Sequence, residues 1–227
     1  MDTPLSYHPR DLLLFSPRVY WALVAGNNDS WWLLALLAPV AGLLLVWQLA
    51  RRGGIRRGQV FAGMGLVWWF VTWSFLWQQY RDINWAVDWI LAPFALAGGL
   101  LLLLAVSPGN LMMRAHRHWI GLALVAWGTL GHPLGFLLDE RSINAADTWL
   151  LFPDPLAVTT LGLTLATLSG WRLALALPVP LLWSLVGGLT LLGLGSPVGW
   201  MMLVAAAAAL VGWLPIGDAV QSQRGTC

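Results

Sequence analysis

Lysine is absent from this sequence of 227 residues, and all 12 basic residues are arginine. Without a lysine amine no Schiff base can form, so a retinal photoreceptor is excluded. The single cysteine, Cys227, excludes an intrachain disulfide and a thiolate metal cluster. Charged residues make up only 10% of the chain and the net charge is +2. With no basic surface interleaved with aromatic residues, we expect no nucleic-acid partner.

Motifs for catalysis and metal binding are also missing. The sequence has no glycine-rich phosphate loop, no HExxH and no nucleophile elbow. Its four histidines are scattered, whereas a metal or a bis-His haem needs several ligands on one side of the membrane. We therefore expect no catalytic residue and no metal, and the sequence identifies no cofactor. It favours a non-enzymatic protein without excluding an enzyme.

Hydrophobic residues are abundant, at 59% of the chain, with a mean hydropathy of +0.71 and 17 tryptophans. This composition predicts an all-α, polytopic transmembrane helix bundle, because about 20 apolar residues cross a bilayer as a helix. Seven segments have that length: residues 31–50, 60–77, 85–106, 119–138, 145–168, 173–194 and 198–214. Residues 1–30 are predicted to form an interfacial amphipathic segment with no cleaved signal peptide, and residues 215–227 a cytoplasmic tail.

Arginine distribution predicts the orientation of the spans. Arg51, Arg52, Arg56 and Arg57 lie in one short loop, which the positive-inside rule puts in the cytoplasm. Alternation from this loop predicts an N-terminus outside and a C-terminus inside. The alternative is six spans, if residues 145–168 do not cross. The predicted location is a bacterial inner membrane.

A tryptophan stripe marks the predicted outer surface. Trp69, Trp73 and Trp77 are four residues apart and share one helical face, which Tyr80 extends. Tryptophan and tyrosine settle at the membrane–water boundary because each has an apolar ring with a polar group. The turn after this stripe is therefore expected to lie at the outer headgroup level.

The fifth predicted segment is irregular, since Pro153 and Pro155 interrupt it. Proline removes a backbone donor, so we expect either a kinked span or a helix that lies partly in the interface. We interpret its threonine stripe as a packing face; the alternative is a broken helix that lines a substrate path. Small residues on the sixth segment are likewise expected to let helices approach closely. The predicted packing residues are Thr160, Thr164, Thr167, Ser184, Gly187 and Gly188.

Two titratable residues lie inside predicted spans, Asp88 in the third and His132 in the fourth. Both fall in the outer leaflet at similar depth, so we predict that they form a functional polar pair. The alternative is that Asp88 reaches headgroup water and His132 bonds a carbonyl freed by Pro133. The predicted outer rim of this site comprises Gln78, Gln79, Arg81, Asp82, Asp139, Glu140, Arg141 and Asp154.

Three stretches resemble a family of uncharacterised bacterial multi-pass inner-membrane proteins with a domain of unknown function. They are Phe15-Ser16-Pro17 with Tyr20, Asn27 and Trp31; residues 80–84 with Trp85 and Ala86; and residues 155–163 together with the motif PLLWSLVGG at residues 180–188. The chain departs from the family pattern at Trp32, Asp154 and Leu156-Ala157. The resemblance implies a membrane fold and carries no activity.

Three functions are therefore weighed. The leading hypothesis is a non-enzymatic accessory or scaffold subunit, with membrane lipids and other membrane subunits as partners, because tryptophans and small-residue faces suit helix contacts. The first alternative is a small-solute or ion transporter that uses the broken fifth helix and the Asp88 and His132 site. The second is a redox subunit that holds quinone or pigment against the tryptophan stripe.

Overall fold

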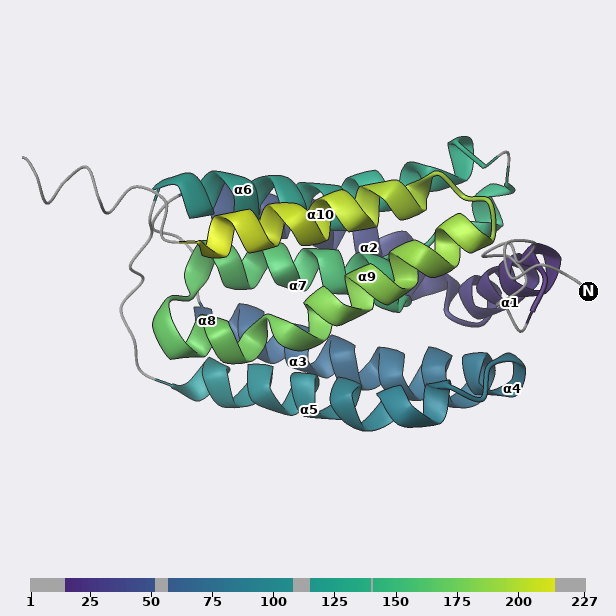
Figure 1. Ribbon diagram of the computed structural model, residues 1–227, viewed down its shortest axis with the longest axis horizontal. Helices are drawn as coiled ribbons and strands as arrows, with labels where there is room; N and C mark the ends of the chain where they lie inside the picture. Colours follow the sequence, from purple (N-terminus) through teal and green to yellow (C-terminus); the bar gives the residue numbers. More distant parts are fainter. Residues whose placement is uncertain (1–14, 52–56, 108–114, 140, 215–227) are drawn as a thin grey trace, which may run out of the picture.

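The computed structural model describes residues 15–51, 57–107, 115–139 and 141–214, and this part of the chain is helical with no strand. Its long helices run back and forth along one axis, with α1 at one end and the last turn of α10 at the other (Figure 1). The main elements are α1 (Pro17–Ser30), α2 (Trp32–Ala50), α3 (Arg57–Val71), α4 (Arg81–Ile83), α5 (Val87–Val106), α6 (Ala115–Ala126), α7 (Pro153–Thr167), α8 (Gly170–Ala176), α9 (Pro178–Gly193) and α10 (Val198–Trp213). Shorter π- and 3₁₀-helical pieces are η3 (Thr72–Tyr80), η4 (Trp127–Gly131), η5 (His132–Leu137) and η6 (Ile143–Ala145).

Within the described residues, five helices are long and apolar enough to cross a membrane. They are Trp32–Ala50, Gly58–Ile83, Val87–Val106, His116–Leu137 and Gly170–Gly193. The all-helical prediction is confirmed, and so are helices of spanning length and composition. The fifth and seventh predicted segments correspond to the shorter helices α7 and α10, of 15 and 16 residues.

Helix α7 is the centre of the bundle, and all 15 of its residues are buried. Helices α6, α9 and α10 pack against it, and Figure 1 shows it among them. The closest approach uses two glycines, because a Cβ on Gly162 would lie 2.5 Å from the carbonyl oxygen of Gly121. A helix that is apolar on every side belongs in a protein core, and α7 matches that description apart from its threonines and Asp154.

The prolines of the fifth predicted segment start α7 instead of breaking it. Pro153 occupies the first position of the helix and Pro155 the third. The first turn tolerates proline because its N–H groups have no partner within the helix. The expectation of a helix broken at these prolines was therefore wrong. The irregular chain lies before Pro153, where residues 146–152 are not helical.

Small residues let α9 and α10 pack closely. A Cβ on Gly188 would lie 3.0 Å from the carbonyl oxygen of Gly199 on α10. Ser184 and Gly187, the other predicted packing residues of α9, are also buried. This small-residue face is therefore occupied by helices of the same chain, so it is not left free for a partner.

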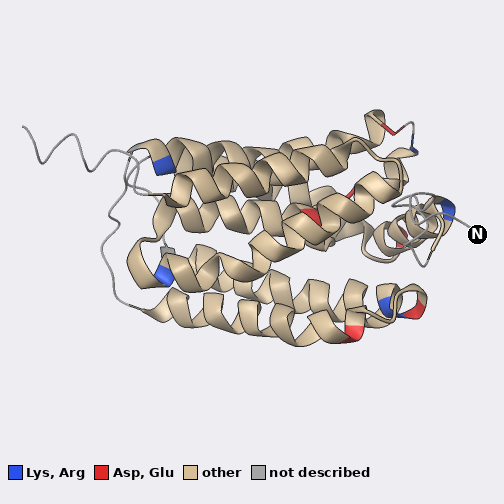
Figure 2. Cartoon of the chain, in the orientation of Figure 1, with Lys and Arg blue, Asp and Glu red and all other residues tan. Residues whose placement is uncertain are grey.

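Acidic residues gather toward one end of the bundle. Figure 2 shows them toward the end that holds α1, together with some arginine, while the opposite end carries arginine. At that opposite end Arg117 donates from Nε to the carbonyl of Gly212 at 2.9 Å and from Nη2 to that of Trp213 at 2.9 Å. A cation at a helix C-terminus satisfies carbonyl groups that have no partner within the helix, so Arg117 fixes the end of α10 against α6.

Candidate functional site

The first turn of α7 holds a buried carboxylate. Asp154 is only 3% exposed, and the indole N–H of Trp183 on α9 donates to its Oδ1 at 2.8 Å. Gly187 makes room for this carboxylate, because a Cβ there would lie 2.7 Å from the same oxygen. An acidic residue in the first helical turn also interacts favourably with the helix dipole. Asp154 is thus anchored between two helices and is not part of the predicted exposed rim.

The non-helical chain before α7 is held by α1. Buried backbone carbonyls need hydrogen-bond donors, and away from solvent only other protein groups or trapped water can supply them. Asn28 donates from Nδ2 to the carbonyls of Asn144 at 2.7 Å and Ala146 at 2.9 Å, and Asn27 donates to that of Leu151 at 3.5 Å. Both asparagines are buried. Helix α1 therefore packs as a structural part of the site, a role that its sequence did not reveal.

Arg141 organises a second group of buried charges beside this chain. Its guanidinium lies 2.9 Å from Asp139 Oδ2 and 3.6 Å from Asp147 Oδ2, and it stacks 3.6 Å over the ring of Trp21. It also donates to the carbonyl of Ala145 at 3.1 Å. The hydroxyl of Ser196 donates to Asp139 at 2.7 Å. The three charged side chains are at most 7% exposed, so they form a buried cluster where an exposed rim was predicted.

The buried acids of this region outnumber its buried base. The region buries three carboxylates and one guanidinium, namely Asp139, Asp147, Asp154 and Arg141. Neither oxygen of Asp147 makes a hydrogen bond among the described residues. An excess of buried carboxylate is costly unless a proton or a cation offsets it. The site is therefore chemically suited to bind positive charge.

A polar cavity of about 440 Å³ opens next to the arginine cluster. Its wall includes Trp21, Asp139, Arg141 and Ser196, so both charged partners of the ion pair border it. No group of three His, Cys, Asp or Glu side chains in the described residues is placed to hold a metal ion. Of the three buried carboxylates only Asp139 borders the cavity, which therefore has a charged wall without the ligand set of a metal centre.

Aromatic rings form a wall beside the site. The ring of Tyr80 lies 5.6 Å from that of Phe15, 6.0 Å from that of Tyr20 and 5.6 Å from that of Phe75. Phe75 in turn lies 5.0 Å from Phe152, which precedes α7. Aromatic pairs at these centroid distances stabilise beyond their buried area. The wall connects α1, the end of the α3–η3 helix and the start of α7.

The neighbouring helix changes to a π-helix where it meets this wall. Residues Thr72–Tyr80 form η3, and Gln79 within it donates from Nε2 to Asn27 Oδ1 at 2.6 Å. π-Helical segments are rare and concentrate at functional sites. A second one, η4, packs against α7. Both features support the start of α7 as the candidate site.

The predicted pair of Asp88 and His132 does not form. Asp88 pairs instead with Arg81, at 2.6 Å between Oδ1 and Nε, and both side chains are about half exposed. His132 is buried on η5, and neither ring nitrogen has a hydrogen bond among the described residues. The similar predicted depth of the two residues was not enough to predict a contact, because depth does not determine which helices are neighbours.

The other predicted residues divide between surface and core. Gln78, Arg81 and Asp82 are exposed, Gln79 is half-buried, and Glu140 lies outside the described residues. Sequence reasoning missed Asn27, Asn28, Asp147 and Trp183 as site residues. Only Asn27 and Trp183 carried a signal, since both belong to the stretches that resemble a known family.

The predicted threonine stripe is buried and packs inside the bundle. Each hydroxyl of Thr160, Thr164 and Thr167 donates to a carbonyl one turn earlier in α7. Thr160 also accepts from the indole N–H of Trp68 at 2.9 Å. These contacts agree with the interpretation as a packing face and give no sign of an open path along α7.

The three stretches that resemble a known family meet at this site. Tyr20 and Asn27 come from the first, Tyr80 from the second, and Pro155 and Trp183 from the third. The model of DUF6064, a family of unknown function, matches residues 17–219. The chain belongs to this family. No curated protein and no solved structure matches this chain. DUF6064 membership confirms the predicted family of unknown function, and the activity has to be argued from the site.

Proposed function

We propose that this DUF6064 protein is a multi-pass membrane protein with seven crossings and α1 on the outer side. Five helices of spanning length support this topology, and α10 is only slightly shorter. The segment from Ala146 to Thr167 adds the remaining crossing, with a non-helical outer part followed by α7. The position of Arg51, Arg117 and Arg172 at the opposite end from α1 agrees with a cytoplasmic side there.

Within this topology, we propose transport of a small cation or of protons, with the binding site at the first turn of α7. One observation carries the proposal: the non-helical chain before α7 and the first turn of α7 carry two buried carboxylates, Asp147 and Asp154, and Arg141 pairs with Asp147 and with a third buried carboxylate, Asp139. Ionisable residues inside membrane bundles mark ion paths and proton relays. Discontinuous helices that begin within a bundle are also a common way to build such sites.

The charge balance selects positively charged substrates. With Asp139, Asp147 and Asp154 ionised against Arg141, the site carries an excess of two negative charges. Neither oxygen of Asp147 makes a hydrogen bond among the described residues, and Asp154 is the second residue of α7. A proton or a monovalent cation would offset the excess, and we propose that it enters by the polar cavity that Asp139 and Arg141 border.

The hypothesis of an accessory or scaffold subunit stays a prediction with less support than before. It was motivated by few buried ionisable groups and by small-residue faces open to partners. The described chain instead buries four charged side chains at one site and uses its small-residue faces internally. A redox subunit with quinone or pigment also stays a prediction, and no further feature of the site favours it.

Flux measurements in proteoliposomes test the transport proposal. We expect the wild-type protein to carry protons or a monovalent cation, followed with internal indicators for H⁺, Na⁺ and K⁺, each under an imposed gradient of that ion. Asp154→Asn should lower the flux at least tenfold, since it keeps the acceptor for Trp183 but removes the charge. Asp88→Asn is the matched control because it removes an exposed carboxylate, and it should keep most of the flux.

Two results would overturn the proposal. One is wild-type flux no higher than that of empty liposomes under all three gradients. The other is equal flux for Asp154→Asn and the wild type. Copurification of a defined set of other subunits from native membranes, combined with absent flux, would return the accessory-subunit hypothesis to first place.

A further inference from the structure

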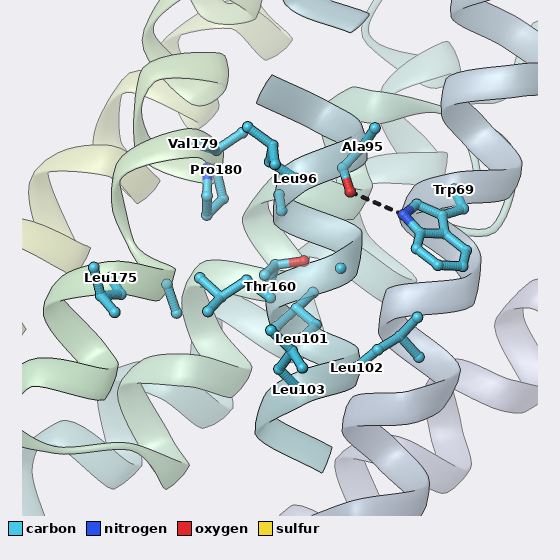
Figure 3. A pocket seen from close by; sticks show the side chains of 14 residues that line it. Trp69, Ala95, Leu96, Leu101, Leu102, Leu103, Thr160, Leu175, Val179 and Pro180 are labelled. Atoms are coloured by element: carbon cyan, nitrogen blue, oxygen red, sulfur yellow. Dashed lines mark hydrogen bonds between the residues drawn. The ribbon is translucent and has the colours of Figure 1, made fainter. Parts of the chain in front are cut away.

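A second cavity lies on the side of the bundle, between α5 and the α8–α9 helix. It is a groove of about 900 Å³, within the range of roughly 300–1,000 Å³ that is usual for ligand sites. Figure 3 shows its lining side chains, nearly all of them apolar. Leu96 and Leu103 on α5 and Leu175 on α8 are each more than half exposed at its edges. The groove is therefore open toward the surface that faces lipid.

The groove has the length of one leaflet. On α5 its lining runs from Ala95 to Leu103, which is about 12 Å of helix at 1.5 Å per residue. Half of the hydrocarbon core measures about 15 Å. These residues belong to the later half of α5, and Leu175 to Pro180 to the early half of the α8–α9 helix. The groove thus follows the half of the bundle that ends in arginine.

The floor of the groove offers no free polar group. Its polar side chain is Thr160 of α7, whose hydroxyl donates to the carbonyl of Leu156 at 2.7 Å. The same oxygen accepts the indole N–H of Trp68 at 2.9 Å. Trp69, at the opposite wall, donates to the carbonyl of Ala95 at 2.8 Å (Figure 3). An occupant therefore meets hydrocarbon and satisfied polar atoms, which suits an alkyl chain.

A cation marks the end of the groove. Arg172 lies three and four residues before Leu175 and Ala176 and seven before Val179, so it shares their helical face. Its neighbour Trp171 is 65% exposed, as expected for an anchor at headgroup level. Arginine attracts the anionic phosphate of a lipid at that level. The apolar groove and Arg172 therefore lie in line, as the acyl chain and the phosphate of one lipid molecule do.

We infer that the groove binds one anionic glycerophospholipid from the leaflet on the arginine side. One acyl chain occupies the groove down to Thr160, and the phosphate lies at Arg172. This site is separate from the carboxylates at the start of α7. It does not depend on the proposed transport activity, so its test stands even if no flux is found.

Gly99 provides a variant that fills the groove. A Cβ on Gly99 would meet only Trp69 Cζ2, at 4.0 Å, so leucine there points into open groove without clashing with the backbone. Gly63 is the matched control, because nothing lies within 4 Å of its Cβ position and it does not line the groove. Gly63 lies six residues after the start of α3 and Gly99 seven residues before the end of α5, and these two helix ends lie at the same end of the bundle (Figure 1). The two leucine variants therefore differ mainly in the groove.

The experiment is native mass spectrometry after reconstitution in equal amounts of phosphatidylglycerol and phosphatidylcholine and extraction in mild detergent. We expect one retained phosphatidylglycerol per wild-type chain and a loss of at least fivefold for Gly99→Leu relative to Gly63→Leu. Arg172→Gln should still retain a lipid but lose the preference for phosphatidylglycerol. If Gly99→Leu does not yield folded protein, Val179→Phe fills the groove from the opposite wall and is judged by the same criterion.

Three outcomes would overturn the inference. Equal lipid retention by Gly99→Leu and Gly63→Leu would show that the lipid lies elsewhere. Equal retention of the two phospholipids by the wild type would remove the role of Arg172. Displacement of phosphatidylglycerol by an equimolar isoprenoid quinone, without recovery at higher phospholipid, would make the quinone the occupant.

Discussion

Arg141→Gln is expected to lower the free energy of unfolding by about 3–5 kcal/mol, because it leaves two buried carboxylates without their cation. Asp139 and Asp147 are 7% and 2% exposed and lie within 4 Å of its guanidinium. Unfolding in detergent, followed by tryptophan fluorescence against denaturant, measures the change. Adding Asp139→Asn and Asp147→Asn should recover most of the loss, since the triple variant buries no uncompensated charge at this position.

The control for this prediction is Arg81→Gln. Arg81 also pairs with an aspartate, Asp88, at 2.6 Å, but their side chains are 41% and 50% exposed. Exposed ion pairs contribute about 0–1 kcal/mol, so this variant should be nearly neutral. A loss for Arg141→Gln no greater than that for Arg81→Gln would show that water or mobile ions already compensate the buried cluster.

Gly162→Leu is expected to prevent folding altogether. Its Cβ alone would lie 2.5 Å from the carbonyl oxygen of Gly121 and 2.6 Å from the amide nitrogen of Val125, both of them backbone atoms of α6. Backbone cannot move aside as a flexible side chain can, so α6 and α7 would have to separate. The expected readout is loss of the monodisperse peak in size-exclusion chromatography after extraction.

Substitution by alanine gives this second prediction a magnitude. The change in the free energy of unfolding should have opposite signs at two glycines. Gly162→Ala should lower stability by about 1–3 kcal/mol through overpacking. Gly63→Ala should raise it by roughly 0.5–1 kcal/mol, because alanine is the better helix former and nothing lies near its Cβ. Stabilisation at both positions would mean that α6 and α7 are not in contact at Gly121 and Gly162.

Hydropathy predicted the helical class and the long helices, because each lipid-facing helix needs a continuous apolar run. It could not identify α7 as the central helix. Helices α2 and α7 are both apolar on nearly every side, yet α2 exposes residues such as Trp32 and Leu36 while α7 exposes none. Which apolar helix lies inside depends on contacts between segments distant in sequence, which a single sequence does not contain.

The site was predicted less well than the fold. Asp154 and Arg141 were assigned to the outer rim of an Asp88 and His132 site, whereas both side chains are buried and the chain around Arg141 is held by α1 and Trp21. The prolines were interpreted as a break because the helix was assumed to begin near residue 145. Its true start at Pro153 satisfies the preference of proline for a first turn. The error therefore concerned where the helix begins.

In the proposed membrane topology, the complete burial of α7 also makes the geometry of the site independent of the thickness of the bilayer. A helix that touches lipid must match the hydrocarbon core by tilting, stretching the membrane or thinning it. At 15 residues α7 is only about 22 Å long, against a core of about 30 Å, but it meets other helices on every side. Hydrophobic mismatch therefore acts on the surrounding helices first. The carboxylates at the start of α7 should keep the same geometry in thin and thick membranes.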